Sequence, residues 1–140
     1  MRVTRNVHAG AFAFFLATLG TTSMASAIEQ ALEGAWVQGG EECTALFSGS
    51  GKAISFRKPV NVFAPAFIIS GNQLRTPTAS CRIKTVKKMG ERRVLTLACT
   101  TSIAVEAVTA VLAPSADGTL RRYVNDADDI ASTYKRCSLR

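Results

Sequence analysis

The sequence predicts an all-β fold, a small antiparallel β-barrel or sandwich of about seven to eight strands. The main observation is that short apolar runs alternate with turn signals along most of the chain, at spacings typical of these folds. The second is an even set of four cysteines, which in a small exported domain favours disulfides over free thiols or a zinc site. No linker, internal repeat or low-complexity segment divides the chain, so we expect one domain.

Residues 1–27 have the three parts of a secretory signal peptide. Arg2 and Arg5 precede the apolar stretch AGAFAFFLATLG, which is too short to span a bilayer, and a final Ala-Ser-Ala offers a cleavage site. We therefore expect export to the bacterial periplasm or the medium, no transmembrane span and a mature domain of residues 28–140. Cleavage would lower the formal net charge from +7 to +5, because the two arginines leave and no acidic residue does.

The leader also contains the only histidine, His8. A mature chain without it has no imidazole base, no Ser-His or Cys-His nucleophile pair and no histidine metal ligand. Asp126, Asp128 and Asp129 lie close together, but they lack the central glycine and the distal glutamate of the common calcium loop. We expect no catalytic residues, no cofactor and no bound metal.

The stretch CRIKTVKKMGERRVLTLAC, residues 81–99, predicts a β-hairpin that folds about Gly90. Residues equidistant from Gly90 would then lie opposite each other. One side of this hairpin is apolar and the other is basic or mixed, as expected of a half-buried pair of strands. The apolar side pairs Cys81 with Cys99, Ile83 with Leu97 and Thr85 with Leu95, and the other side pairs Arg82 with Ala98, Lys84 with Thr96, Val86 with Val94 and Lys88 with Arg92.

This hairpin selects one of the three possible disulfide pairings. Opposed cysteines at a non-hydrogen-bonded position of a ladder can reach bonding distance. We therefore expect Cys81–Cys99, which leaves Cys43–Cys137 to tie the first mature strand to the last. In the chain-entropy model these bridges stabilise the fold by roughly 3 and 4–5 kcal/mol respectively.

The segments before the hairpin follow from their turn signals. Residues 28–32 are expected to form a short helical turn before GAW opens the first strand. ECTALF is expected as a strand with its cysteine, alanine and phenylalanine on one side, followed by the turn SGSGK and the strand AISF. VFAPAFII contains Pro65, which predicts an edge strand or a strand broken by a bend. Gly71-Asn72 is expected as a tight turn into QLRT.

The segments after the hairpin complete the sheet. SIAVEAVTAVLA is expected as a long strand, and Asp117-Gly118 as a hairpin turn into TLRRYV. VNDADDI is expected as a short helical turn capped by Asn125. STYKRCSL is expected as the closing strand, in which Thr133, Cys137 and Leu139 point inward and Tyr134 and Arg136 point outward.

Gly34-Ala35-Trp36 resembles the G-x-W signature of the calycin barrels, which include the lipocalins and the small periplasmic inhibitors of serralysin-type metalloproteases. The string GAWVQGGEEC resembles the opening of the inhibitor family, with a tryptophan on the first strand and a cysteine shortly after. In that family the N-terminal segment inserts into the protease cleft, which implies an inhibitory segment at Ile28, Glu29 and Gln30. That family has one disulfide, whereas this chain has cysteines for two. The layout also resembles small exported proteins of alphaproteobacteria, which implies no function.

Two further groups of residues are candidate sites. Lys87, Lys88, Arg92 and Arg93 crowd the tip of the hairpin, where an anionic partner would relieve their repulsion. Charged turns also simply keep β-proteins soluble and unpaired. No aromatic residue lies among these cations to stack a base, so nucleic acid is not expected. Trp36 is a candidate barrel plug, with ordinary core packing as the alternative.

The segment around Pro59 and Pro65 allows two interpretations. An irregular flap would place Phe63, Phe67, Ile68 and Ile69 at a pocket mouth, whereas an ordinary core edge would bury them. A barrel of this length is usually filled by its own side chains.

We therefore expect a disulfide-stabilised, non-catalytic binding module, inhibitor-like, whose partner is an exported protein. The alternative is an envelope-associated protein that binds anionic glycan or lipid through the basic hairpin tip, and a small-molecule carrier is a third option.

Overall fold

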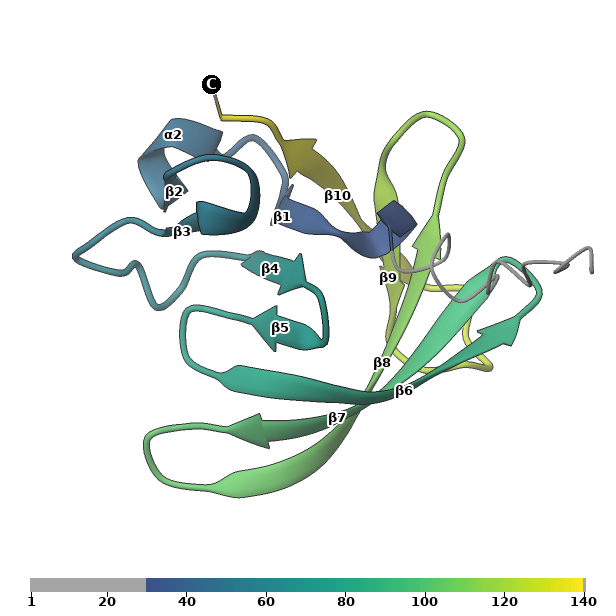
Figure 1. The fold of residues 1–140 in the computed structure, drawn as a ribbon. Coiled ribbons are helices and arrows are strands. Elements are labelled where there is room, and N and C mark those ends of the chain that lie inside the picture. The colour runs from purple at the N-terminus through teal and green to yellow at the C-terminus, as the bar shows by residue number, and fades with distance from the viewer. Residues whose placement is uncertain (1–29, 140) are drawn as a thin grey trace, which may run out of the picture.

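Residues 30–139 are described by the computed structural model, and their strands form a closed antiparallel barrel in the order β1-β10-β9-β8-β7-β6-β5-β4. This confirms the expected fold class and both disulfides. The leader of residues 1–27 lies outside the described residues. Within residues 30–139 no helix is long and apolar enough to cross a bilayer. The barrel strands, drawn in Figure 1, are β1 (Gly34–Gln38), β4 (Ala66–Ser70), β5 (Gln73–Arg75), β6 (Ser80–Met89), β7 (Arg92–Thr100), β8 (Val105–Pro114), β9 (Leu120–Tyr123) and β10 (Ala131–Cys137).

A second apolar core lies outside the barrel, against the outer faces of β1 and β4. The segment between these two strands supplies it. Figure 1 shows this segment at one corner of the molecule, near the C-terminal end. It contains α2 (Cys43–Leu46), β2 (Phe47–Ser48), η1 (Gly51–Ala53) and β3 (Ser55–Phe56). The disulfide Cys43–Cys137 joins it to β10.

The strand expected for ECTALF is wrong, because Cys43–Leu46 is helical. Leu46 and Phe47 are consecutive residues and are both buried in the second core. Successive side chains of a strand point to opposite faces, so a single strand could not bury both residues in the same core. The change from helix to strand at Phe47 turns them to the same side.

The barrel core contains twelve buried residues, among them Trp36, Phe67, Leu97 and Tyr134. On β10, the period of two that the sequence predicted is present, but the expected faces are reversed. Tyr134 faces the barrel core, and Cys137 faces the second core. The reason is that both sides of the sheet are covered here, so an apolar residue on β10 does not identify the barrel interior.

The β6–β7 hairpin pairs the two cysteines as expected and keeps that register through Ile83 and Leu97. A β-bulge then shifts the register by one residue, so that Val86 faces Leu95 instead of Val94. One extra residue moves the following side chains to the opposite face of a strand. Val86 thereby packs against the barrel core, which leaves the hydroxyl of Thr85 exposed instead of buried. The expected pairs Lys84–Thr96, Thr85–Leu95, Val86–Val94 and Lys88–Arg92 are therefore wrong.

Several turns match the sequence. Ser70 pairs with Gln73, which confirms the two-residue turn at Gly71-Asn72. The turn between β8 and β9 contains Asp117, whose carboxylate accepts hydrogen bonds from the backbone N–H and the hydroxyl of Thr119 at 2.9 and 2.7 Å. These bonds, the hydroxyl first, lower the pKa of Asp117 from its ordinary value.

Pro65 immediately precedes β4, which pairs with both β1 and β5. The strand is therefore broken by a bend at Pro65, and it is not an edge strand. The proline sits where it removes no N–H from the ladder.

Candidate functional site

A cleft of about 340 Å³ opens into the barrel between the segment that precedes β4, the β5–β6 turn and strand β8. Its base is apolar and includes Phe67, Leu74, Leu97 and Leu112. Its rim is polar and includes Thr76, Thr78, Glu106, Thr109 and Arg122. An apolar base with a few polar groups at the rim is the usual composition of a ligand site.

The cleft exists because the barrel wall is incomplete on one side of β8. The short strand β9 pairs only with residues 111–114 of β8, whereas β7 pairs with residues 105–112. The first half of β8 therefore has a neighbour on one side alone among the described residues. Its inward-facing side chains at Glu106, Val108 and Ala110 line the cleft.

Of the four residues considered for a flap, Phe67 lines the cleft, together with Pro65 and Val62. Phe63 is 90% exposed. Ile68 and Ile69 are buried in the second core and the barrel core respectively. The irregular segment that ends at Pro65 thus contributes one wall of the cleft.

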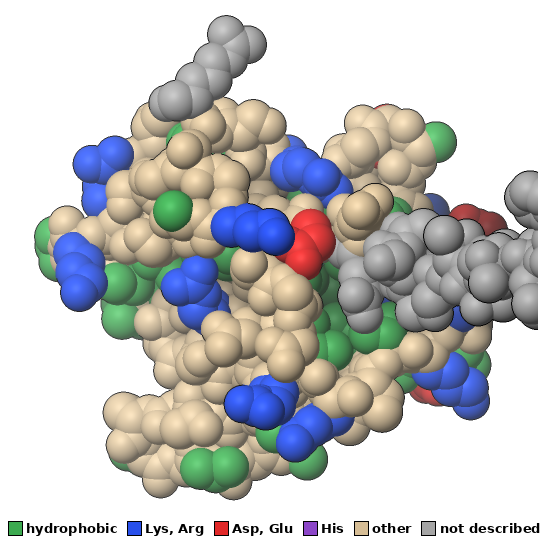
Figure 2. Space-filling view, in the orientation of Figure 1, with side chains coloured by type: hydrophobic (Ala, Val, Ile, Leu, Met, Phe, Trp, Pro, Cys, Tyr) green, Lys and Arg blue, Asp and Glu red, His purple; other side chains and the backbone are tan. Residues whose placement is uncertain are grey.

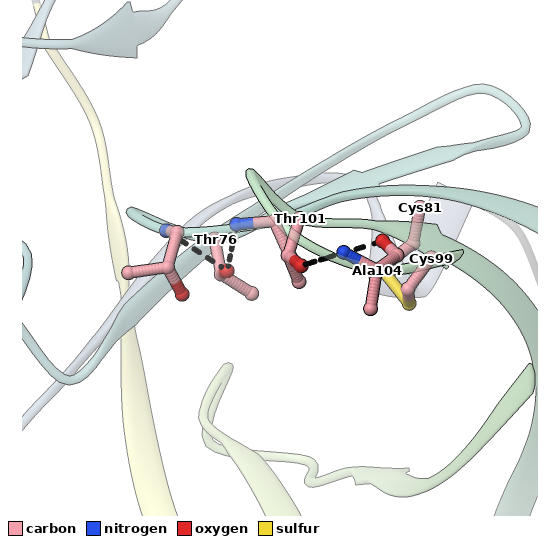
Figure 3. Close-up of a disulfide and its surroundings, with 7 residues drawn as sticks. Thr76, Cys81, Cys99, Thr101 and Ala104 are labelled. Carbon is pink, nitrogen blue, oxygen red and sulfur yellow. Dashed lines mark hydrogen bonds between the residues drawn. A yellow bond between two sulfur atoms is a disulfide. The ribbon is translucent and has the colours of Figure 1, made fainter. Parts of the chain in front are cut away.

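A disulfide in the cleft wall has two similar turns near it, as Figure 3 shows. Cys81 and Cys99 line the cleft and are bridged. The turn TPTA precedes β6 and the turn TSIA follows β7. In each turn the backbone N–H of the threonine, Thr76 or Thr101, donates to the carbonyl oxygen of the alanine three residues later, at 2.9 Å in both cases.

The threonine hydroxyls tighten these turns further. Oγ1 of Thr76 accepts hydrogen bonds from the N–H groups of Thr78 and Ala79, at 3.3 and 3.0 Å. Oγ1 of Thr101 accepts the equivalent bonds from Ile103 and Ala104, also at 3.3 and 3.0 Å. Side-chain bonds of this kind satisfy backbone groups that a turn would leave open. The disulfide and the TPTA turn thus restrain the cleft directly, whereas the TSIA turn restrains the connection between β7 and β8.

Three polar side chains are placed to meet a ligand. Tyr134 is only 4% exposed, and its ring centroid lies 5.0 Å from that of Phe67. Glu106 and Arg122 are exposed and face the cleft from β8 and β9. Among residues 30–139 none of these three side chains takes part in an ion pair, the one ion pair there being Arg92–Asp129.

Trp36 lies deeper in the barrel, paired in register with Phe67. Its indole Nε1–H donates to the carbonyl oxygen of Leu32 at 2.8 Å, and the guanidinium carbon of Arg136 lies 4.7 Å from its ring centroid. Gly34 begins β1 two residues before the tryptophan, with a φ of 127° that favours glycine. The role of Trp36 as a plug stays a prediction.

The four cations of the hairpin tip do not form one surface. The Arg92 guanidinium stacks at 3.8 Å from the Tyr123 ring centroid and donates to a carboxylate oxygen of Asp129 at 2.9 Å. Nη1 of Arg93 folds back onto carbonyl oxygens of its own turn, at 3.2–3.3 Å. Lys87 and Lys88 are exposed, and as neighbours on a strand they point to opposite faces. Figure 2 shows Lys and Arg side chains scattered over the visible face. Anion binding at the tip stays a prediction.

Only one residue of the proposed inhibitory segment lies within the described residues. Ile28 and Glu29 lie outside the described residues, and Gln30 is exposed at the start of a helical turn. Leu32, two residues later, is 2% exposed and belongs to the barrel core. A test of this segment must therefore replace residues 28–30 and keep Leu32.

The aspartates after β9 form a bend, and the helical turn expected there is wrong. The capping role of Asn125 is present, since its Oδ1 accepts hydrogen bonds from the N–H groups of Ala127 and Asp128 at 2.9 and 2.8 Å. The ion pair between Arg92 and Asp129 joins this bend to the hairpin tip. Within the described part of the chain, no group of three His, Cys, Asp or Glu side chains is placed to hold a metal ion.

Comparisons with protein-family models, curated proteins and solved structures give no match to this chain. The resemblance to calycin-type inhibitors stays a prediction. Sequence reasoning missed Glu106, Arg122 and Tyr134 as residues of the cleft. A local signal for one of its walls was present in the T-x-x-A turn of residues 76–79.

Proposed function

We propose that this protein is an exported, non-catalytic binding module whose ligand binds in the cleft at the mouth of the barrel. The observation that carries the proposal is the construction of that cleft. It is hollow, its base is apolar, and the Cys81–Cys99 disulfide and the threonine-bonded turn of residues 76–79 restrain its walls. A site restrained before binding loses less conformational entropy when its ligand arrives.

The size of the cleft limits the ligand. Sites for small molecules usually have volumes of about 300–1,000 Å³, and this cleft, at about 340 Å³, lies at the low end. It suits a small apolar molecule, or a few side chains of a protein partner. The inhibitor-like role expected from the N-terminal segment belongs to the same class of function, with an exported protein as the partner.

The cysteines support the proposed compartment. Both disulfides are of the kind that persists outside the reducing cytosol. The leader of residues 1–27 would direct the chain to the periplasm or the medium.

The test uses 8-anilinonaphthalene-1-sulfonate, an apolar probe with one anionic group, titrated into the oxidised protein and followed by fluorescence. Ala110→Phe fills the cleft, because Ala110 lines it. Ala107→Phe is the matched control, since Ala107 is an exposed alanine on the same strand that does not line the cleft. We expect binding at one site in the wild type and in Ala107→Phe, and at least about tenfold weaker binding in Ala110→Phe. Equal binding by the two variants would rule out the cleft as the site.

A further inference from the structure

The first half of β8 is a free sheet edge. Residues 105–110 pair with β7 on one side, and within residues 30–139 nothing pairs with their other side. About six residues is the length of an ordinary strand. A row of unpaired backbone N–H and C=O groups of that length can accept another strand.

This edge has one of the features that proteins use to block such pairing, the inward-pointing charge of Glu106, and lacks the others. Its sequence, VEAVTA, contains no proline and a single charge, Glu106. The pairing of β7 with β8 shows no bulge. At its start, Ile103 and Val105 are 94% and 78% exposed. Natural proteins usually protect edges with charges, prolines or bulges, so this one is open to pairing.

The cleft runs along the same edge. Glu106, Val108 and Ala110 line it from β8, and Val62 and Pro65 line it from the segment that precedes β4. A strand added to β8 would place every second side chain in the cleft, since side chains alternate along a strand. Backbone pairing would supply affinity and the cleft would supply specificity, which is how added strands are recognised elsewhere.

The charges at the two ends of the free edge, Arg122 and Glu106, indicate which charges a bound strand should carry. A strand that continues the line of β9 runs antiparallel to β8, so its inward residues lie opposite Ala110, then Val108, then Glu106. Arg122 lies opposite Leu112, next to the first of these positions. An acidic side chain there meets Arg122, an apolar one at the second position enters the cleft, and a basic one at the third meets Glu106.

We propose that the free edge of β8 and the adjoining cleft bind an extended peptide segment with the pattern acidic-x-apolar-x-basic, added as a strand antiparallel to β8. The proposal rests on the proposed function, because it assigns the cleft of that function to a peptide. It identifies the ligand as a segment of an exported protein in extended conformation.

The probe is the capped hexapeptide Glu-Thr-Val-Thr-Lys-Thr, whose six residues lie opposite residues 110 to 105, and the control is its charge reversal, Lys-Thr-Val-Thr-Glu-Thr. Each is titrated into the oxidised protein by calorimetry. Amide hydrogen exchange is then measured in the bound state. We expect the first peptide to bind and to slow exchange within residues 105–110. The charge-reversed peptide should bind roughly fivefold more weakly, as expected for exposed ion pairs.

Two further controls separate backbone pairing from side-chain contact. N-methylation of alternate peptide amides, either at the threonines or at the other three residues, removes donors from one edge of the peptide only. One of these two forms should lose binding and the other should keep it. Glu106→Lys should weaken binding roughly fivefold, whereas Glu91→Lys, the same change in the exposed β6–β7 turn, should not.

The outcomes distinguish the two proposals. If the fluorescent probe binds in the cleft but neither peptide binds, the peptide proposal is overturned and the proposed function stands. If both N-methylated peptides bind equally, strand addition is overturned. If residues 105–110 are already protected in a dimer of the free protein, a second copy occupies the edge and the peptide proposal is again wrong.

Discussion

Removing the Cys81–Cys99 disulfide tests how the mouth of the barrel is held. The bridge closes a loop with a sequence separation of 18 residues, for which the chain-entropy model gives about 3 kcal/mol. The Cys43–Cys137 bridge has a separation of 94 residues, which gives about 4.7 kcal/mol. The larger loop contains the smaller one, but the logarithmic dependence on length makes this overlap worth only about 0.2 kcal/mol.

The variants are Cys81→Ala/Cys99→Ala and Cys43→Ala/Cys137→Ala. Each also loses two sulfur atoms that pack in a core, so the difference between the variants is the sharper quantity. We expect the second variant to be less stable than the first by about 1.5 kcal/mol. The assay is equilibrium unfolding in urea without reductant, with equal m-values as a check on two-state behaviour.

The same pair of variants has a functional readout. Cys81→Ala/Cys99→Ala should bind the fluorescent probe more weakly, because these two residues line the cleft. Cys43→Ala/Cys137→Ala should bind it normally, because its bridge lies at the second core. The reasoning is refuted if the smaller loop costs as much stability as the larger one, or if the two variants bind the probe equally.

Three other predictions concern the rest of the barrel. Trp36→Phe leaves the carbonyl of Leu32 without its donor and should cost about 2–4 kcal/mol in urea unfolding; a loss below about 1 kcal/mol would contradict its place in the core. Thr119→Val removes the hydroxyl that lowers the pKa of Asp117, so a carboxyl NMR titration should show that pKa rise, and an unchanged value would contradict the assigned cause. A carboxylate with a lowered folded-state pKa stabilises the fold at pH values above its ordinary pKa near 4, and this stabilisation is lost as the pH falls through the lowered pKa. The stability of this variant should therefore depend less on pH in that window. Arg92→Gln removes the stacking and the pairing at the hairpin tip and should cost about 1 kcal/mol or less, because Asp129 is exposed; a loss above about 3 kcal/mol would show that the bend is more deeply coupled to the barrel than its contacts indicate.

Local signals explain which parts of the fold could be predicted. Cys81 and Cys99 lie at equal distances from Gly90, and the hairpin turn places them opposite each other. The register beyond Ile83 could not be predicted, because a regular ladder and a bulged ladder both offer an apolar inward side. The bulged ladder is preferred over the regular one because it packs Val86 against the core and leaves Thr85 in water.

Nonlocal packing explains the errors. The predicted inward and outward faces of β10 are the reverse of those observed, because the prediction assumes a single core. The segment that starts at Cys43 covers the outside of β1 and β4 with a second core. The cleft depends on where β9 ends relative to β8, which no local pattern specifies. The sequence alone therefore does not distinguish Glu106 and Arg122 from charges that face solvent.

The most direct test of the central claim is methyl NMR of the oxidised protein saturated with 8-anilinonaphthalene-1-sulfonate. The leucine methyl groups at the base of the cleft, at Leu74, Leu97 and Leu112, should shift most. Those of Leu46 and Leu139 in the second core should stay in place. Shifts confined to residues around the β6–β7 tip or to Gln30, with the cleft leucines unmoved, would contradict the account.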